Sequence, residues 1–305
     1  MTTALYMHDD CLGHITPPGH PEQVARLQVI ARALEPLTLD RRLAPLCEDR
    51  DILLCHPQRY LDKIAAAVPS EGTVPLDADT HMSAGSMQAA RRAVGANIAA
   101  VNAVLDGEVT NAFVATRPPG HHAETETQMG FCLFGNVAIA AKHALSKGLE
   151  RVAVVDFDVH HGNGTQDLLW DEPGVLFFSS HQSPLWPGTG TEGERGAHDQ
   201  IVNLPLEPHT GSQAMRQTYQ GRVFPMIDDY KPQLILISAG FDAHMADPLA
   251  QLNWSTDDFT WITRELMALA DRHCQGRIVS TLEGGYDLEA LAASAAAHAS
   301  ALSQG

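Results

Sequence analysis

Residues 152–164 read Val-Ala-Val-Val-Asp-Phe-Asp-Val-His-His-Gly-Asn-Gly and join an apolar run directly to a cluster of polar side chains. The run Val152–Val155 has no polar interruption, as expected for a central strand of a parallel sheet that is buried on both faces. The polar residues begin at Asp156, where that strand is expected to end. Reactive groups of open α/β sheets lie at the carboxyl ends of the strands, so this stretch indicates both the fold class and the place of a site.

Further apolar runs rich in Val, Ile and Phe alternate with patterns of helical period. The expected strands are Ala4–Met7, Ala112–Thr116, Val152–Phe157, Val175–Ser179, Ile201–Leu204, Leu234–Ser238 and Arg277–Thr281. Expected helices carry apolar stripes over 24–34, 87–105 and 259–269, and the third is preceded by Ser255 and Asp258 in capping-box spacing. Such alternation predicts an α/β fold with one central, mostly parallel sheet flanked by helices on both faces. No shift in composition marks a boundary, so residues 1–305 are expected to form a single domain.

The composition limits the classes of function. The 305 residues include 37 acidic residues against 20 Lys and Arg, giving a formal net charge of −17, together with 16 His. This balance argues against nucleic acid and anionic membranes as partners and is compatible with cationic substrates. Five Cys without a C-x-x-C pair indicate a reducing compartment. With no secretory leader and no apolar run of membrane-spanning length, a soluble, cytoplasmic protein is expected.

The residues after Val155 predict a metal site. At the tip of an extended strand, Asp156, Asp158 and His160 alternate onto one face and can converge on one cation. Zinc accepts such ligands, and catalytic sites combine three of them with a water. Asp242, after the apolar strand 234–238, could supply a further carboxylate. A lone D-x-H is more simply a solvated loop or a helix cap, but two carboxylates, two His and two Gly in nine residues favour the metal.

Two other clusters follow expected strands and carry acid–base groups. His121 and His122 come after a rigid Pro-Pro-Gly turn, a placement suited to proton transfer to and from a polarised water. Gly284 and Gly285 let the backbone approach a ligand, and Tyr286 has a hydroxyl free to donate. Each cluster alone could be a surface His pair or an ordinary turn. Their common place after strand ends predicts that they meet at one rim of the sheet.

The order of motifs RPPGHHA, GFCLFGNVA, DFDVHHGNGTQ, PGTG, AGFDAHMADP and LEGGYDLEAL closely resembles the zinc-dependent histone deacetylase and acetylpolyamine amidohydrolase family. The resemblance runs from Pro18 to Tyr286 and so covers nearly the whole chain. The His20-Pro-Glu sequence, Asn163 and the LEGGY loop look like those of class II-like bacterial members. The resemblance implies a single-domain arginase/deacetylase-like fold and a hydrolase acting on linear amide C–N bonds.

By this resemblance, one catalytic Zn²⁺ would be held by Asp158, His160 and Asp242. His121 and His122 would flank a zinc-activated water, with His122 as general base and acid. Asp156 would orient His121, and Asn163 would contact His122. Tyr286 would donate to the carbonyl oxygen and then to the oxyanion. A structural K⁺ would use Asp156, the backbone of Asp158, His160 and Ser180, and the Ser179 hydroxyl.

The resemblance also implies the substrate contacts. Asp79 would grip the substrate backbone at the rim, and Gly130 and Phe131 would form one tunnel wall, with Gly284 in the loop before Tyr286. Trp186 stands where relatives usually carry Phe, which leaves the acyl-chain preference open. Leu249 aligns with a Glu of some polyamine deacetylases and cannot pair with a secondary ammonium group, so an acylated lysine or a neutral amide is favoured over an acetylpolyamine.

The leading hypothesis is therefore a zinc-dependent amidohydrolase that removes acetyl or another short acyl group from a lysine side chain in a protein or peptide. An acetylpolyamine or another small acylated amine or amide is the alternative substrate, and a homo-oligomer is possible. An arginase-like ureohydrolase with two manganese ions is disfavoured because its paired D-x-H-x-D and D-x-D patterns are absent. A non-catalytic acyl-lysine-binding module is also considered, although the presence of Tyr286, His121 and His122 argues against it.

Overall fold

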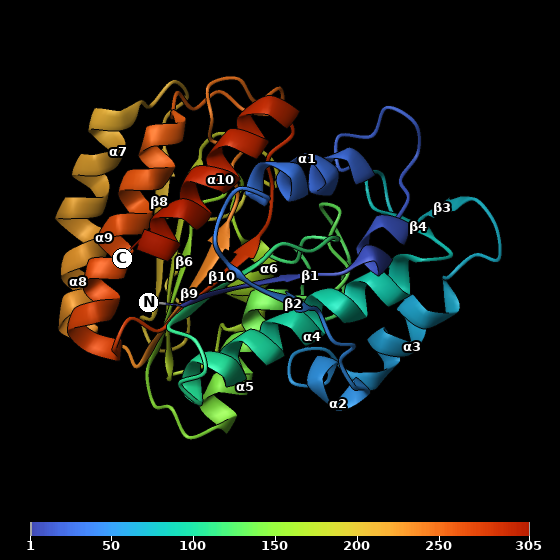
Figure 1. The fold of residues 1–305 in the computed structure, drawn as a ribbon, viewed down its shortest axis with the longest axis horizontal. Coiled ribbons are helices and arrows are strands. Elements are labelled where there is room, and N and C mark those ends of the chain that lie inside the picture. The colour runs from blue at the N-terminus through green and yellow to red at the C-terminus, as the bar shows by residue number, and fades with distance from the viewer. Residues whose placement is uncertain (1, 305) are drawn as a thin grey trace.

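Eight parallel strands form the central sheet of the computed structural model, which describes residues 2–304 (Figure 1). Their order is β2-β1-β5-β10-β9-β6-β7-β8, and all seven neighbouring pairs run parallel. The strands are β1 (Thr3–Met7), β2 (Asp40–Leu43), β5 (Asn111–Val114), β6 (Val152–Asp156), β7 (Val175–Gln182), β8 (Ile201–Leu206), β9 (Leu234–Ala239) and β10 (Ile278–Leu282). Met1 and Gly305, which the predicted domain 1–305 includes, lie outside the described residues.

All seven predicted strands lie in this sheet, and the predicted α/β class is confirmed. The eighth strand, β2, lies at one edge and was not predicted because its sequence Asp-Arg-Arg-Leu has no apolar run. Two further short strands, β3 (Thr73–Pro75) and β4 (His81–Ser83), pair antiparallel outside the main sheet. Three residues are too few for a period-two pattern to be recognised in a sequence.

Helices cover both faces of the sheet, as predicted (Figure 1). On one face, apolar side chains of α1 (Val24–Leu34), α9 (Thr256–Cys274) and α10 (Leu288–Gln304) share a core with residues of α7 (Ser212–Thr218) and α8 (Phe224–Tyr230). The other face is covered by α4 (Ser86–Leu105) and α5 (Asn136–Ser146). The remaining helices are α2 (Asp49–Ile52), α3 (Gln58–Ala66) and α6 (Asn163–Leu168), with a 3-10 turn at Asp9–Gly13 and a π-helical turn at Tyr219–Val223.

The three apolar stripes correspond to α1, α4 and α9, and the predicted capping box is present at the start of α9. The backbone N–H of Ser255 donates to Asp258 Oδ2 at 2.9 Å, and the Ser255 side chain accepts from the backbone of the third helical residue. Helices α5 and α10 were not predicted. Both are rich in Ala and apolar on most sides, so they lack the alternation of faces that marks an amphipathic helix. None of the described helices has the length and apolar character needed to cross a membrane.

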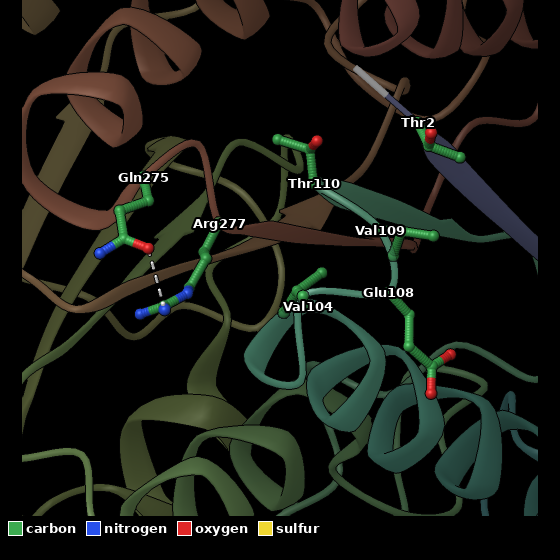
Figure 2. Close-up of a pocket in the computed structure, with 8 residues that line it drawn as sticks. Thr2, Val104, Glu108, Val109, Thr110, Gln275 and Arg277 are labelled. Atoms are coloured by element: carbon green, nitrogen blue, oxygen red, sulfur yellow. Dashed lines mark hydrogen bonds between the residues drawn. The ribbon is translucent and has the colours of Figure 1, made fainter.

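The amino ends of β1, β5 and β10 surround a polar pocket of about 300 Å³ (Figure 2). Thr2, Thr110 and Arg277 each directly precede one of these strands and line the pocket. The Arg277 guanidinium donates to Gln275 Oε1 at 3.2 Å, the hydrogen bond drawn in Figure 2. This pocket lies at the end of the sheet opposite to the predicted site.

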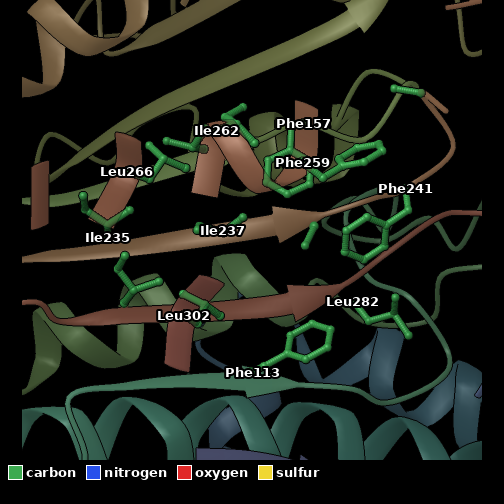
Figure 3. Close-up of a cluster of buried hydrophobic side chains, with 14 of the residues drawn as sticks. Phe113, Phe157, Ile235, Ile237, Phe241, Phe259, Ile262, Leu266, Leu282 and Leu302 are labelled. Carbon is green, nitrogen blue, oxygen red and sulfur yellow. The ribbon is translucent and has the colours of Figure 1, made fainter. Parts of the chain in front are cut away.

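The largest core cluster places aromatic rings directly beneath the carboxyl ends of the strands (Figure 3). Phe241 and Phe259 pack edge to face with centroids 5.2 Å apart, and Phe157 lies 6.2 Å from Phe241. Burial of such a ring contributes about 1.5–3 kcal/mol. Phe157 and Val159 point into this core, so the residues that alternate with them point the other way. The strand tip therefore supplies the core and the predicted metal site with alternate side chains.

Candidate active site

The four predicted clusters follow the four central strands. The strands β5, β10, β9 and β6 are neighbours in the sheet, and their carboxyl ends lie side by side. The chain after β5 carries His121 and His122, and the chain after β10 carries Tyr286. Asp242 follows β9, while Asp158 and His160 follow β6. The distances given below confirm the prediction that these residues lie together at one rim of the sheet.

Asp158, His160 and Asp242 form a buried cluster in which one ligand atom of each lies within 4.8 Å of the others. His160 Nδ1 lies 3.2 Å from Asp158 Oδ1 and 3.1 Å from Asp242 Oδ2. Burial lowers the pKa of His160, but its hydrogen bonds to the two carboxylates outweigh burial and raise the pKa to about 10. Two buried carboxylates around one imidazole favour a cation between them. Two oxygen donors and one nitrogen donor fit a catalytic zinc site with an open position.

Backbone N–H groups and two glycines orient these carboxylates. The N–H of Val159 donates to Asp242 Oδ1 at 2.9 Å, and the N–H of Gly284 donates to Asp158 Oδ2 at 2.8 Å. A Cβ atom at Gly284 would lie 2.1 Å from Asp242 Oδ2, and one at Gly240 would lie 2.1 Å from Asp158 Oδ2. Both positions therefore require glycine. Gly284, which the family resemblance relates to substrate, lies against the carboxylates, and its contact with substrate stays a prediction.

The tandem histidines have different partners. His121 Nδ1 lies 3.0 Å from Asp156 Oδ2, whereas His122 Nδ1 lies 2.7 Å from Asn163 Oδ1. The Asn163 amide donates to Glu124 Oε1 at 2.8 Å, which fixes Asn163 Oδ1 as an acceptor. His122 Nδ1 must then carry the proton, because only a donor can satisfy that oxygen. The Nε2 atom of His122 is thereby left with its lone pair.

The charges around the two imidazoles differ accordingly. Burial lowers the pKa of His121, but the Asp158 and Asp156 carboxylates outweigh it and hold the pKa well above its usual value. Burial and the charges of His121 and His160 hold the pKa of His122 well below its usual value. His122 is therefore neutral near pH 7 and can accept a proton, while its neighbour carries positive charge.

Tyr286 is held by a buried arginine. The Arg26 guanidinium donates to the carbonyl oxygens of Glu283 at 2.5 Å and of Gly285 at 2.6 Å, and its Cζ lies 5.0 Å from the centroid of the Tyr286 ring. Burial raises the pKa of Tyr286 well above its usual value. The phenol is consequently protonated at neutral pH and can donate a hydrogen bond.

Arg26 belongs to a fully buried ion cluster that the sequence did not reveal. Arg26 donates to Glu22 Oε1 at 3.0 Å, and Arg117 donates to Glu22 Oε2 at 2.5 Å. Arg26, Arg117 and Glu22 are each 0% exposed. Arg26 lies within an amphipathic helix, where the pattern alone predicts a solvated side chain. The cluster joins α1 and the loop after β5 to the Tyr286 loop.

Two acidic residues near the site were also missed as backbone anchors. Glu283 Oε2 accepts from the N–H groups of Gly120 at 2.7 Å and His121 at 3.1 Å. Asp247, for which the sequence suggested no definite role, accepts from the N–H of Tyr286 at 2.7 Å. Burial raises the pKa of both carboxyls to about 7. Each stands next to a recognised motif, but no spacing rule distinguishes such an anchor from a ligand.

A cavity of about 200 Å³ leads to this centre. The lining residues are Asp79, His122, Gly130, Phe131, His160, Leu185, Trp186, Leu249 and Tyr286. The predicted substrate residues Asp79, Gly130, Phe131, Trp186 and Leu249 thus lie in one cavity with the histidines and the tyrosine. The Phe131 and Tyr286 rings meet edge to face with centroids 5.8 Å apart. A narrow channel of this kind suits an extended aliphatic group.

The residues predicted to bind potassium lie at the adjoining ends of β6 and β7. Asp156 and Ser179 are register partners on these strands, and both are buried. Asp156 Oδ1 also accepts from the N–H of Asp158 at 3.0 Å, and Ser180 Oγ lies 2.6 Å from the Tyr219 hydroxyl. This placement beneath Asp158 and His160 is compatible with a cation, and the potassium site stays a prediction.

Residues 20–302 match the family described as "Histone deacetylase domain". The chain belongs to the histone deacetylase family. The deacetylase-family resemblance and the arginase/deacetylase-like fold predicted from the motifs are thereby confirmed. Family membership makes this deacetylase-family protein a hydrolase acting on amides.

Relatives of this family member include proteins of bacteria, archaea and plants. It is 40% identical over 286 residues to a "Histone deacetylase-like amidohydrolase" of Pseudomonas aeruginosa, covering 90% of this chain and 75% of the relative. It is 38% identical over 298 residues to a "Probable deacetylase" of Archaeoglobus fulgidus, covering 95% of this chain and 82% of the relative. The solved structure of the HDA15 HD domain superposes with a TM-score of 0.94 at 32% identity, covering 99% of this chain and 88% of that chain.

Proposed function

We propose that this protein is a zinc-dependent deacylase that removes acetyl or another short acyl group from a lysine side chain in a protein or peptide. The observation that carries this proposal is the buried Asp158–His160–Asp242 cluster, which lies beside His122 and Tyr286 at a narrow cavity. Zinc bound by the cluster would supply a Lewis acid that activates water near pH 7 and polarises the acyl carbonyl. Everything else in the reaction falls to residues of this chain.

Proton transfer belongs to His122. Its Nδ1–H donates to Asn163, so Nε2 is the atom that accepts a proton from the attacking water. The same Nε2–H then donates to the nitrogen of the departing amine. His121 stays paired with Asp156, and the centroids of the His121 and His122 rings lie 3.9 Å apart. The charge of His121 therefore lowers the pKa of His122, so that His122 gives up the proton readily to the departing amine.

The oxyanion is stabilised by Tyr286. Its phenol is protonated at neutral pH, and the loop that carries it is fixed by Arg26 at two carbonyl oxygens and by Asp247 at the Tyr286 N–H. Such a preorganised donor is aimed at charge that develops only as the carbonyl carbon becomes tetrahedral. A donor in this role is worth about 10²–10³ in rate.

Substrate selection rests on the cavity walls. Phe131 and Trp186 would enclose the four methylenes of an acyl-lysine, and the Asp79 carboxylate at the cavity would accept backbone N–H groups of the peptide. We further propose a structural K⁺ at Asp156, Asp158, His160, Ser179 and Ser180, and action in the cytoplasm. A homo-oligomer is compatible with this proposal and is not required by it.

An acetylpolyamine is the second candidate substrate. The formal net charge of −17 and the carboxylate of Asp79 favour a cationic amine. Leu249 opposes it, because its apolar side chain lines the cavity where a polyamine would need a partner for its secondary ammonium group. The peptide substrate is therefore preferred.

The test compares kcat/KM of the zinc-loaded protein on acetyl-lysine peptides, longer-acyl and lactyl-lysine peptides, acetylpolyamines and small neutral amides. We expect acyl-lysine peptides to be hydrolysed fastest, with inhibition by a hydroxamate. Faster hydrolysis of acetylpolyamines would replace the proposed substrate with the alternative. Binding of acyl-lysine peptide by zinc-loaded protein without any turnover would instead support the non-catalytic binding module.

A further inference from the structure

The chain after the proposed zinc ligand His160 is tied to the Trp186 loop (residues 183–190) through one side chain, His161. His161 is 1% exposed, and its Nδ1 lies 2.8 Å from Thr189 Oγ1 while its Nε2 lies 3.1 Å from Gln166 Oε1. Gln166 Oε1 also accepts from Asn203 at 2.7 Å, and the Gln166 amide donates to Glu194 Oε2 at 2.7 Å. His161 Nε2 therefore carries the proton, and Nδ1 accepts from the Thr189 hydroxyl.

Two further side chains, His181 and Glu194, fix the end of the Trp186 loop. His181 Nε2 lies 3.0 Å from the carbonyl oxygen of Gly190, and its ring centroid lies 4.7 Å from that of His161. The Glu194 carboxylate accepts from the N–H groups of Gly190 at 3.2 Å and Thr191 at 2.9 Å. A Cβ at Gly190 would lie 2.6 Å from both imidazoles, so the loop backbone packs directly against the two rings and position 190 requires glycine.

Trp186 itself has a large exposed surface and depends on this loop for its position. The side chain is 41% exposed, and its indole meets the rings of His122 at 4.7 Å and His160 at 6.1 Å between centroids. On the opposite wall, a Cβ at Gly130 would lie only 2.6 Å from Trp186 Cη2. The indole thus reaches across to Gly130, and a shift of its loop would change the width of the cavity.

We propose that His161 is a positioning residue that sets acyl-chain selectivity: through its bond to Thr189 it holds Trp186 against Gly130 and keeps the cavity narrow. His161 is absent from the cavity lining, so it acts through the loop and not on the substrate. The inference rests on the proposed deacylase function, since selectivity is defined by the acyl groups that the cavity admits.

The matched pair Thr189→Val and Thr189→Ser tests this bond. Valine removes the hydroxyl and keeps the shape, whereas serine keeps the hydroxyl, and Thr189 is exposed, so neither change enters the core. Loss of one such hydrogen bond corresponds to about 3- to 10-fold. We expect Thr189→Val to lower the ratio of kcat/KM for acetyl-lysine over hexanoyl-lysine peptides by about that factor. Thr189→Ser is expected to keep the parent ratio.

A second readout does not need activity. Trp170 and Trp186 are the strongly exposed tryptophans, at 43% and 41%, while Trp254 is buried and Trp261 is half-buried. In a background that carries Trp170→Phe and Trp261→Phe, acrylamide quenching of tryptophan fluorescence therefore reports chiefly on Trp186. Thr189→Val should raise the quenching constant and Thr189→Ser should not.

Equal quenching in the two variants, or an unchanged acyl ratio in Thr189→Val, would overturn the inference. If no acyl-lysine peptide is hydrolysed, the proposed function fails while the quenching experiment still decides whether His161 and Thr189 hold Trp186. His161→Phe completes a double-mutant cycle with Thr189→Val. If the two residues act through their shared hydrogen bond, Thr189→Val should have no further effect on quenching in the His161→Phe background. If that variant does not fold, the Thr189 pair decides alone.

Discussion

The two ends of the central sheet each carry a cavity, and the cavities differ in what lies beneath them. The pocket at the amino ends is the larger, about 300 Å³ against about 200 Å³, and its charged residues are the exposed Glu108 and the half-buried Arg277 (Figure 2). The smaller cavity at the carboxyl ends lies against Asp158, His160 and Asp242, all buried. Burying ionisable side chains destabilises the folded state, so clusters of them occur mainly at functional sites. Volume therefore does not distinguish the two ends, whereas buried charge does.

The largest difference between the ends should follow removal of a proposed zinc ligand. Asp242→Ala leaves only two donors for the metal. Loss of a group that merely hydrogen-bonds to a metal ligand typically lowers metal affinity about 10–100-fold, so loss of a ligand itself should lower the affinity further. We expect purified Asp242→Ala to contain far less than one zinc per chain by elemental analysis, with deacylation lost. Glu108→Ala, which removes a carboxylate from the pocket at the amino ends of the strands, should keep the parent zinc content and the parent rate of deacylation. Stoichiometric zinc in Asp242→Ala would remove Asp242 from the ligand set.

Removal of the proposed oxyanion donor, Tyr286, should have the next largest effect. Tyr286→Phe should lower kcat about 10²–10³-fold while zinc content and the unfolding midpoint stay unchanged. The matched control is Tyr230→Phe, because the Tyr230 hydroxyl is buried without a hydrogen-bond partner among the described residues. Its kcat should equal that of the parent. Near-parent kcat in Tyr286→Phe would exclude the phenol from the reaction.

A third change tests the buried ion cluster below the Tyr286 loop. Glu22→Gln leaves Arg26 and Arg117 buried without their carboxylate, and unpairing a buried charge destabilises proteins by about 3–5 kcal/mol. We expect the free energy of unfolding in urea to fall by about that amount. Glu126→Gln breaks the exposed pair with Arg59 and should leave the unfolding curve unchanged. Equal stability of the two variants would show that burial of the cluster has no energetic consequence.

The smallest effect concerns the pH dependence of stability away from both ends. Burial lowers the pKa of His298 to about 3, and its ring lies between the Thr263 and Ser280 hydroxyls at 2.6 and 2.7 Å. The unfolded chain, with a histidine pKa near about 6.5, takes up a proton first as the pH falls, so stability drops below about pH 6.5.

One such group contributes a slope of up to about 1.4 kcal/mol per pH unit. His298→Gln should therefore reduce the slope of unfolding free energy against pH between about pH 6 and 4 by roughly this amount. The measurement is a series of urea unfolding curves for parent and variant. Parallel slopes would mean that His298 is not held neutral by the fold.

The comparison of the two ends also explains what the sequence could reveal. Asp158 and His160 could be predicted because strand period places them on one face, and the strands because β6 and β9 are continuous apolar runs. Arg26 and Glu283 could not, because a charged residue in a helical stripe or beside a glycine pair carries no sign of burial. Their roles come from contacts between segments 257 residues apart along the chain. Strand β2 was missed because its position at the edge allows charged side chains.

The alternation at the tip of β6 restricts how this site can change. Phe157 and Val159 are packed in the apolar core, while Asp158 and His160 face the candidate metal site and Asp156 contacts His121. Inserting or deleting one residue between 156 and 160 would turn carboxylates into the core and aromatic groups toward the proposed metal site at the same time. The segment can therefore vary by substitution but not in length, because one change in length would disturb the candidate active site and the hydrophobic core together.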